Sequence, residues 1–169
     1  MNARAGRRTL VACVGNVLRG DDGFGVAVAE RLAEDGSLPA SVDLVETGIG
    51  GLGIVHQLLD GAGYDQLIVV DAVDRGEPPG TVFVLEPQVP EPSTLGLDEW
   101  RARFTNLHLA EPGRVFLLAR ALGVLPERVL LVGCQPRSCE ELGQALSQPV
   151  ASAVDIAAQR VRQLVGCQA

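Results

Sequence analysis

Aromatic side chains are scarce in this sequence. One tryptophan, one tyrosine and four phenylalanines occur among 169 residues, although 47% of the residues are hydrophobic. The core must therefore consist mainly of Val, Leu, Ile and Ala. A chain of this length buries enough surface to form a core without disulfides or structural metals. We expect residues 1–169 to form a single domain, with residues 1–8 as a flexible basic tail.

Long hydrophobic runs and an excess of positive charge are also missing. No apolar stretch approaches the roughly 20 residues that span a bilayer. The 14 basic residues are outnumbered by 21 acidic ones, which gives a net charge of −7. We therefore expect neither nucleic acid nor an anionic membrane as a partner. The N-terminus faintly resembles a twin-arginine export signal, but the apolar run at residues 10–14 is too short for one. These features predict a cytoplasmic protein and favour a monomer.

Cysteine and histidine are too few and too scattered to form a recognisable motif. The four cysteines (Cys13, Cys134, Cys139 and Cys167) include no C-x2-C pair, so a zinc ribbon or a redox motif is excluded and reduced thiols are expected. The chain also lacks the G-x-S-x-G sequence of a serine nucleophile. A pairing of Cys134 or Cys139 with a histidine has no support in the spacing. The sequence thus predicts no serine or cysteine nucleophile.

Short apolar runs alternate with helical patterns along the chain. This order predicts an α/β protein with three layers, α/β/α, around a mainly parallel, five-stranded twisted sheet. A tight turn at residues 78–80 makes one edge strand a candidate for antiparallel pairing. Residues 87–107 break the pattern, and we interpret them as an irregular excursion over the strand ends with room for one helical turn. A solvated loop of no function is the alternative. The expected strands cover residues 9–14, 42–45, 67–70, 81–85 and 129–132.

Acidic residues follow three successive predicted strands. Asp21 and Asp22 come after the first strand, Glu46 ends the second, and Asp71 ends the third. Ligands of open α/β sheets bind beyond the carboxyl ends of the strands, and carboxylates gathered there repel one another unless a cation joins them. The alternative interpretation is that Asp21 and Asp22 cap the following helix and that Asp71 bonds loop amides.

The two histidines bear on which metal such a site would hold. Oxygen ligands alone suit magnesium or calcium, whereas an added imidazole favours nickel, zinc or another transition metal. His56 lies beside the apolar face of a predicted helix over residues 52–59 and is interpreted as a flanking residue rather than a ligand. His108 follows the irregular excursion, which could bring it over the acidic edge. A histidine in a surface loop is the alternative.

A glycine-rich loop competes with the metal-site interpretation. Residues 48–53 match G-x-G-x-x-G after a strand, and Asp71 follows at a later strand end, as in a dinucleotide-binding protein. However, this loop follows the second strand rather than the first. The acids of the first loop would also repel a pyrophosphate at the same edge. A dinucleotide-binding protein using this loop and Asp71 remains the alternative hypothesis.

Several motifs together resemble a known family. The sequence G-N-x4-D-D-G-x-G at residues 15–25 resembles the signature of the hydrogenase maturation endopeptidases. TGIGG at 47–51, LIVVDAVDRG at 67–76 and VGCQP at 132–136 occur in the matching order. The resemblance covers nearly the whole chain and implies a three-layer α/β/α fold. It also implies removal of a C-terminal extension from the nickel-loaded precursor of a nickel-iron hydrogenase large subunit.

The resemblance further implies a set of functional positions. Asp22, Asp71 and His108 match the family's metal-contacting and catalytic residues, and they would meet nickel that the substrate supplies. Other divalent metals could occupy the same site in vitro. Glu46 matches a position near the substrate, and the glycines at 48, 50 and 51 could let a substrate backbone approach closely. A nickel-binding maturation factor without peptidase activity is a further alternative.

Overall fold

The computed structural model describes residues 7–61, 63–104, 112–143 and 145–166. A five-stranded sheet with the order β2-β1-β3-β5-β4 lies at its centre. Four strands are parallel, and the edge strand β4 runs antiparallel to β5. The predicted sheet, including its antiparallel edge, is therefore confirmed. The strands are β1 (Thr9–Val14), β2 (Val42–Gly48), β3 (Gln66–Ala72), β4 (Val82–Leu85) and β5 (Arg128–Cys134).

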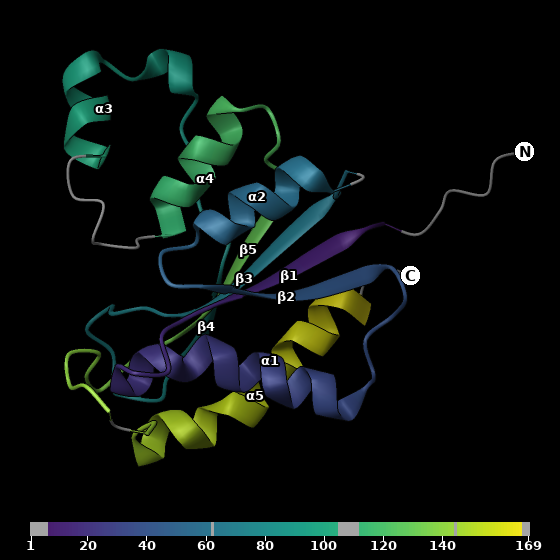
Figure 1. Ribbon diagram of the computed structural model, residues 1–169, viewed down its shortest axis with the longest axis vertical. Coiled ribbons are helices and arrows are strands. Elements are labelled where there is room, and N and C mark those ends of the chain that lie inside the picture. Colours follow the sequence, from purple (N-terminus) through teal and green to yellow (C-terminus); the bar gives the residue numbers. More distant parts are fainter. Residues whose placement is uncertain (1–6, 62, 105–111, 144, 167–169) are drawn as a thin grey trace, which may run out of the picture.

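Helices cover both faces of the sheet, which gives the three predicted layers (Figure 1). The helices α1 (Phe24–Asp35) and α5 (Gln148–Gly166) cover one face, while α2 (Leu52–Asp60) and α4 (Pro112–Ala121) cover the other. Three short elements complete the fold: η1 (Gly20–Gly23), η2 (Pro92–Thr94) and α3 (Leu97–Phe104). No helix among these residues is both long and apolar enough to cross a membrane.

The core is aliphatic, as the scarcity of aromatic residues predicts. Every residue of β1 is buried, as is every residue of β3 except Ala72 at its end. Continuous apolar runs are typical of parallel strands that are covered on both faces. Only two aromatic side chains, Phe24 and Phe116, rank among the largest fully buried ones within the described ranges. They lie on opposite faces of the sheet, in α1 and α4.

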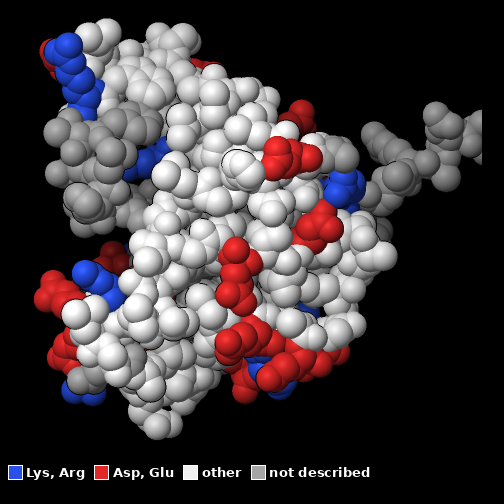
Figure 2. Space-filling model, viewed as in Figure 1, with Lys and Arg blue, Asp and Glu red and all other residues white. Residues whose placement is uncertain are grey.

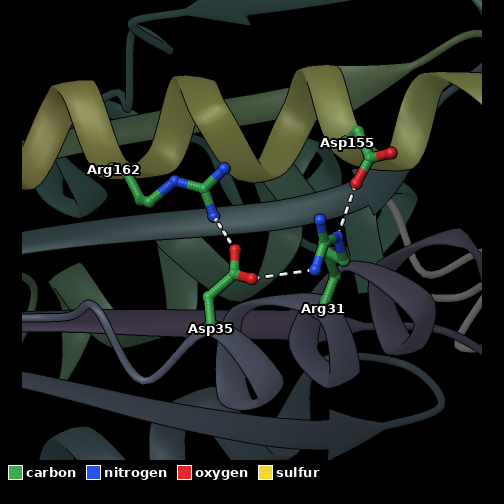
Figure 3. A network of polar contacts seen from close by, with 4 residues as sticks. All are labelled: Arg31, Asp35, Asp155 and Arg162. Carbon is green, nitrogen blue, oxygen red and sulfur yellow. Dashed lines mark hydrogen bonds and ion pairs between the residues drawn. The ribbon is translucent and has the colours of Figure 1, made fainter.

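An ion-pair network links the two helices on one face (Figure 3). Arg31 of α1 contacts Asp155 of α5 and, at 2.8 Å, Asp35 of its own helix. Asp35 in turn contacts Arg162 of α5. Because these side chains are exposed in part or in full, solvent screens their charges and each pair adds little to stability. The network therefore fixes the alignment of α1 and α5 more than it stabilises the protein.

The segment after β4 leaves the sheet and packs beside α4. The Arg120 side chain of α4 donates a hydrogen bond to the backbone carbonyl of Val89 and lies 3.5 Å from the Glu91 carboxylate. The segment then forms η2 and α3, so it contains two helical elements where the sequence indicated an irregular excursion. Its continuation at residues 105–107 lies outside the described residues.

Candidate active site

A close approach of backbone segments brings the first acidic loop to the carboxyl edge of the sheet. Gly25, near the start of α1, lies against the ends of β1 and β3. A Cβ atom at this position would lie 2.0 Å from the carbonyl oxygen of Val14 and 2.8 Å from that of Val70. Only glycine fits such a contact. The helix α1 therefore begins directly over these strand ends, and η1 with its two aspartates is held there.

Asp71 is a buried carboxyl group at the end of β3. Its side chain is 5% exposed. Burial raises its pKa well above the ordinary value, the negative charge of Asp22 raises it further, and a hydrogen bond from the backbone of Ala72 opposes the shift only in part. Burying a carboxylate costs free energy unless it is paired or binds a cation. Asp71 is thus a residue whose position weakens the fold.

Asp22 lies in η1, and its negative charge acts on Asp71. Burial raises the pKa of this half-buried side chain, while the charge of Arg19 and a hydrogen bond from the backbone of Asn16 lower it. The charges of Asp22 and Asp71 interact, since the first raises the pKa of the second. Two neighbouring carboxylates that both resist ionisation form an arrangement that a divalent cation would stabilise.

Asp21 has a different role from its neighbour. Its side chain is 2% exposed and accepts four hydrogen bonds from the loop after β5. Although burial raises the pKa of Asp21, these hydrogen bonds lower it overall. The donors are the backbone N–H groups of Arg137 (2.7 Å), Ser138 (3.3 Å) and Ser147 (2.6 Å) and the Ser147 hydroxyl (2.9 Å). Asp21 therefore joins η1 to the residues that enter α5.

The capping interpretation of these two aspartates is wrong. Neither η1 nor α1 has a side-chain hydrogen bond at its N-cap, where Arg19 and Gly23 stand. Ser147 directly precedes α5, and its carbonyl accepts the N–H of Ala151. Its hydroxyl, however, donates to Asp21. The bonds that satisfy Asp21 come from residues more than 110 positions away, so sequence spacing could not reveal them.

We predict that Asp21→Asn destabilises the protein by roughly 2–3 kcal/mol at pH 7, because charge-assisted hydrogen bonds are lost and an amide nitrogen faces backbone donors. The pKa of Asp21 is depressed in the folded state, so its contribution is present above the unfolded pKa and is lost as pH falls through the folded one. The difference from wild type in urea denaturation should therefore shrink below about pH 4. The control Asp60→Asn alters an exposed acid and should change stability little. A stability difference between Asp21→Asn and wild type that stays constant at all pH values would contradict this account.

Gln135 is a structural residue that sequence reasoning missed. Its side chain is 5% exposed, and its Oε1 accepts the backbone N–H groups of Arg75 (2.7 Å) and Glu77 (3.2 Å). Its Nε2 donates to the Asp74 carboxylate (2.9 Å) and to the carbonyl of Pro136 (3.1 Å). Gln135 thus fastens the loop after Asp71 to the end of β5. The only sequence feature that could have pointed to Gln135 was its place in the VGCQP motif.

The loop after β2 carries the remaining candidates. Glu46 is exposed near the end of β2, while Gly48, Gly50 and Gly51 have positive φ angles of 67°, 83° and 66°. These left-handed conformations explain the glycines without a bound nucleotide. No heavy atom lies within 4 Å of a Cβ built at Gly48 or Gly50, so both face open space. A close approach of a substrate backbone there stays a prediction.

The histidines and cysteines were the remaining candidates for a metal ligand or a nucleophile. His56 lies within α2, where it is exposed and its Nδ1 is 3.2 Å from Asp60, as expected of a residue beside the apolar face of that helix. His108 lies outside the described residues. Burial and neighbouring acids raise the pKa of Cys134 to about 11 and that of Cys139 to about 12, which disfavours thiolate nucleophiles. Within the described ranges, no group of three or more His, Cys, Asp or Glu side chains is arranged to hold a metal ion.

Comparisons of the sequence with known proteins find a matching family model and similar relatives. A family model described as hydrogenase maturation protease matches residues 26–164. A hydrogenase expression/formation protein of Rhodobacter capsulatus is 39% identical over 158 residues, which is 93% of this chain and 71% of that protein. The matched range of the family model includes Asp71 and begins after Asp22.

Two solved structures extend the similarity to the fold. The hydrogenase 2 maturation peptidase of a Thaumarchaeota archaeon has a TM-score of 0.65 and 35% identity, covering 95% of this chain and 99% of that one. The hydrogenase maturating endopeptidase HybD of Escherichia coli has a TM-score of 0.68 and 30% identity, covering 91% and 89%. The three-layer fold is therefore similar to the folds of these two peptidases.

Proposed function

We propose a specific substrate and site for this chain, which belongs to the hydrogenase maturation protease family. It removes a short C-terminal extension from the nickel-loaded precursor of a nickel-iron hydrogenase large subunit. The nickel belongs to the substrate and acts as the recognition element. Asp22, Asp71 and His108 receive it.

The pair formed by Asp22 and Asp71 carries this proposal. A buried carboxyl group whose pKa is raised by burial and by a second carboxylate is unfavourable in the free protein. Its position is useful when a cation arrives, because the cation removes the repulsion and stabilises the ionised forms. Two carboxylates with one imidazole form a donor set that suits a borderline divalent ion such as nickel.

The proposed chemistry is hydrolysis by water. The high thiol pKa values of Cys134 and Cys139 argue against a cysteine nucleophile. Water would add across the scissile amide, with one product gaining a carboxylate and the other an amine. Binding of the substrate's nickel to Asp22 and Asp71 places the scissile bond at the sheet edge, and a divalent ion there can polarise the carbonyl or the water.

Intact-mass spectrometry of a large-subunit precursor tests the proposal. We expect the nickel-loaded precursor to lose the mass of its C-terminal extension when incubated with this protein, and the nickel-free precursor to stay whole. General substrates such as casein should stay intact. Nickel binding without cleavage would indicate a metal-binding maturation factor instead. Cleavage that is independent of nickel would refute the recognition role.

A further inference from the structure

Exposed apolar side chains gather on the loops around the acid pair. Five of the large hydrophobic residues with high exposure lie at the carboxyl edge of the sheet, and each is between 60 and 72% exposed. Four come from three loops, and the fifth, Leu52, is the first residue of α2. Single exposed apolar residues are normal on a protein surface, but a group on neighbouring loops indicates an interaction site. We call this group the apolar rim; it consists of Val17, Leu18, Ile49, Leu52 and Leu142.

Backbone hydrogen bonds hold these three loops together. The N–H of Gly143 donates to the carbonyl of Leu18 at 2.8 Å, which joins the loop after β5 to the loop after β1. The N–H of Gly15 donates to the carbonyl of Gly48 at 3.2 Å, which joins the loop after β1 to the last residue of β2, directly before the loop that carries Ile49. The apolar rim is therefore fixed by the same backbone that positions η1 and Asp22.

Charged residues are unevenly distributed over the face shown in Figure 2. In the view of Figure 2, acidic residues gather over α1, whereas the surface over α2 and α4 is largely uncharged. Because each copy of this chain carries a net charge of −7, two copies repel each other, which disfavours a second copy as the occupant of the apolar rim. A different protein with an apolar surface is therefore the occupant that fits best.

We propose that the apolar rim docks onto the folded precursor, on the apolar protein surface that surrounds its nickel ion. This inference rests on the proposed function. Asp71 lies at a strand end and is almost fully buried, so a metal ion held inside a folded partner reaches it only if the surrounding loops contact that partner. Apolar side chains beside the acids also exclude water, which strengthens the attraction between carboxylates and a cation.

Neutral polar variants of the apolar rim test the docking. In Leu18→Gln/Leu142→Gln we expect the KM for nickel-loaded precursor to rise about tenfold, because two side chains lose apolar contacts, with kcat within about twofold of wild type. Ile49→Gln should raise KM in the same direction. The matched control Leu122→Gln/Ile156→Gln alters exposed apolar residues outside these loops and should leave both constants unchanged. The melting temperature of each variant confirms folding.

The outcomes separate the docking from the proposed function. A wild-type KM in all rim variants, or a fall in kcat alone, would overturn the docking and leave the nickel-dependent cleavage standing. Retention of the precursor on immobilised protein measures binding without cleavage, so rim-dependent retention supports the docking even if no cleavage occurs. A wild-type dimer that dissociates in the rim variants, seen by analytical ultracentrifugation, would assign the surface to a second copy and overturn the proposal.

Discussion

Asp71→Asn is expected to abolish processing of the precursor and, at the same time, to stabilise the protein. Changing a side chain that supports a metal ligand typically costs 10–100-fold, so loss of a direct ligand should reduce the rate by at least about a hundredfold. Stability should rise by roughly 1–3 kcal/mol at pH 7, because a buried carboxylate is replaced by a neutral amide. Intact-mass assays and urea denaturation measure the two effects.

The pH dependence of this stabilisation has a definite sign. The pKa of Asp71 is raised in the folded state by burial and then by Asp22, so wild-type stability falls as pH rises from the unfolded pKa through the folded one. The advantage of Asp71→Asn should therefore grow with pH over this interval. Asp21→Asn serves as the control, since its effect has the opposite sign. A variant that still processes the precursor normally, or that is less stable than wild type, would contradict the assignment.

Gly25→Ala is expected to have the largest effect on folding. Its new methyl group would lie 2.0 Å from the Val14 carbonyl oxygen and 2.8 Å from that of Val70, both of which are backbone atoms. The helix α1 would have to move away from the strand ends, carrying η1 and Asp22 with it. Overpacking against rigid backbone predicts a loss of about 3 kcal/mol or more.

Gly113→Ala in α4 is the matched control for this substitution. No heavy atom lies within 4 Å of a Cβ at Gly113, and alanine in a helix restricts the unfolded chain, so stability should stay unchanged or rise by about 0.4–1 kcal/mol. Equal stability of Gly25→Ala and wild type in urea would mean that α1 does not approach the sheet as closely as described.

Much of the fold follows from local patterns in the sequence. The bounds of β1 were predicted without error, because a continuous β-branched run between a polar tail and a glycine has one interpretation. The antiparallel β4 was predicted from a turn too short for a crossover. The α3 helix was predicted only as one helical turn within an irregular excursion, since Leu97–Phe104 carries no clear apolar face and follows three prolines.

The site was predictable only in part. Strand-end placement brought Asp22 and Asp71 to one edge, but nothing local told Asp21 from Asp22. Their difference arises from loop amides more than 110 residues away that bond Asp21 and leave Asp22 to face Asp71. Gln135 was missed for the same reason, because its partners belong to another loop. Such long-range hydrogen bonds are a property of the folded chain.

Diffraction from crystals soaked in nickel, recorded at the nickel absorption edge, would test most directly whether the acid pair receives a divalent ion. We predict a single strong anomalous peak between the carboxylates of Asp22 and Asp71, with the imidazole of His108 as a further ligand, and no such peak in Asp71→Asn. Anomalous peaks confined to places remote from both carboxylates, or a His108 ring held on the opposite side of the molecule, would contradict the account.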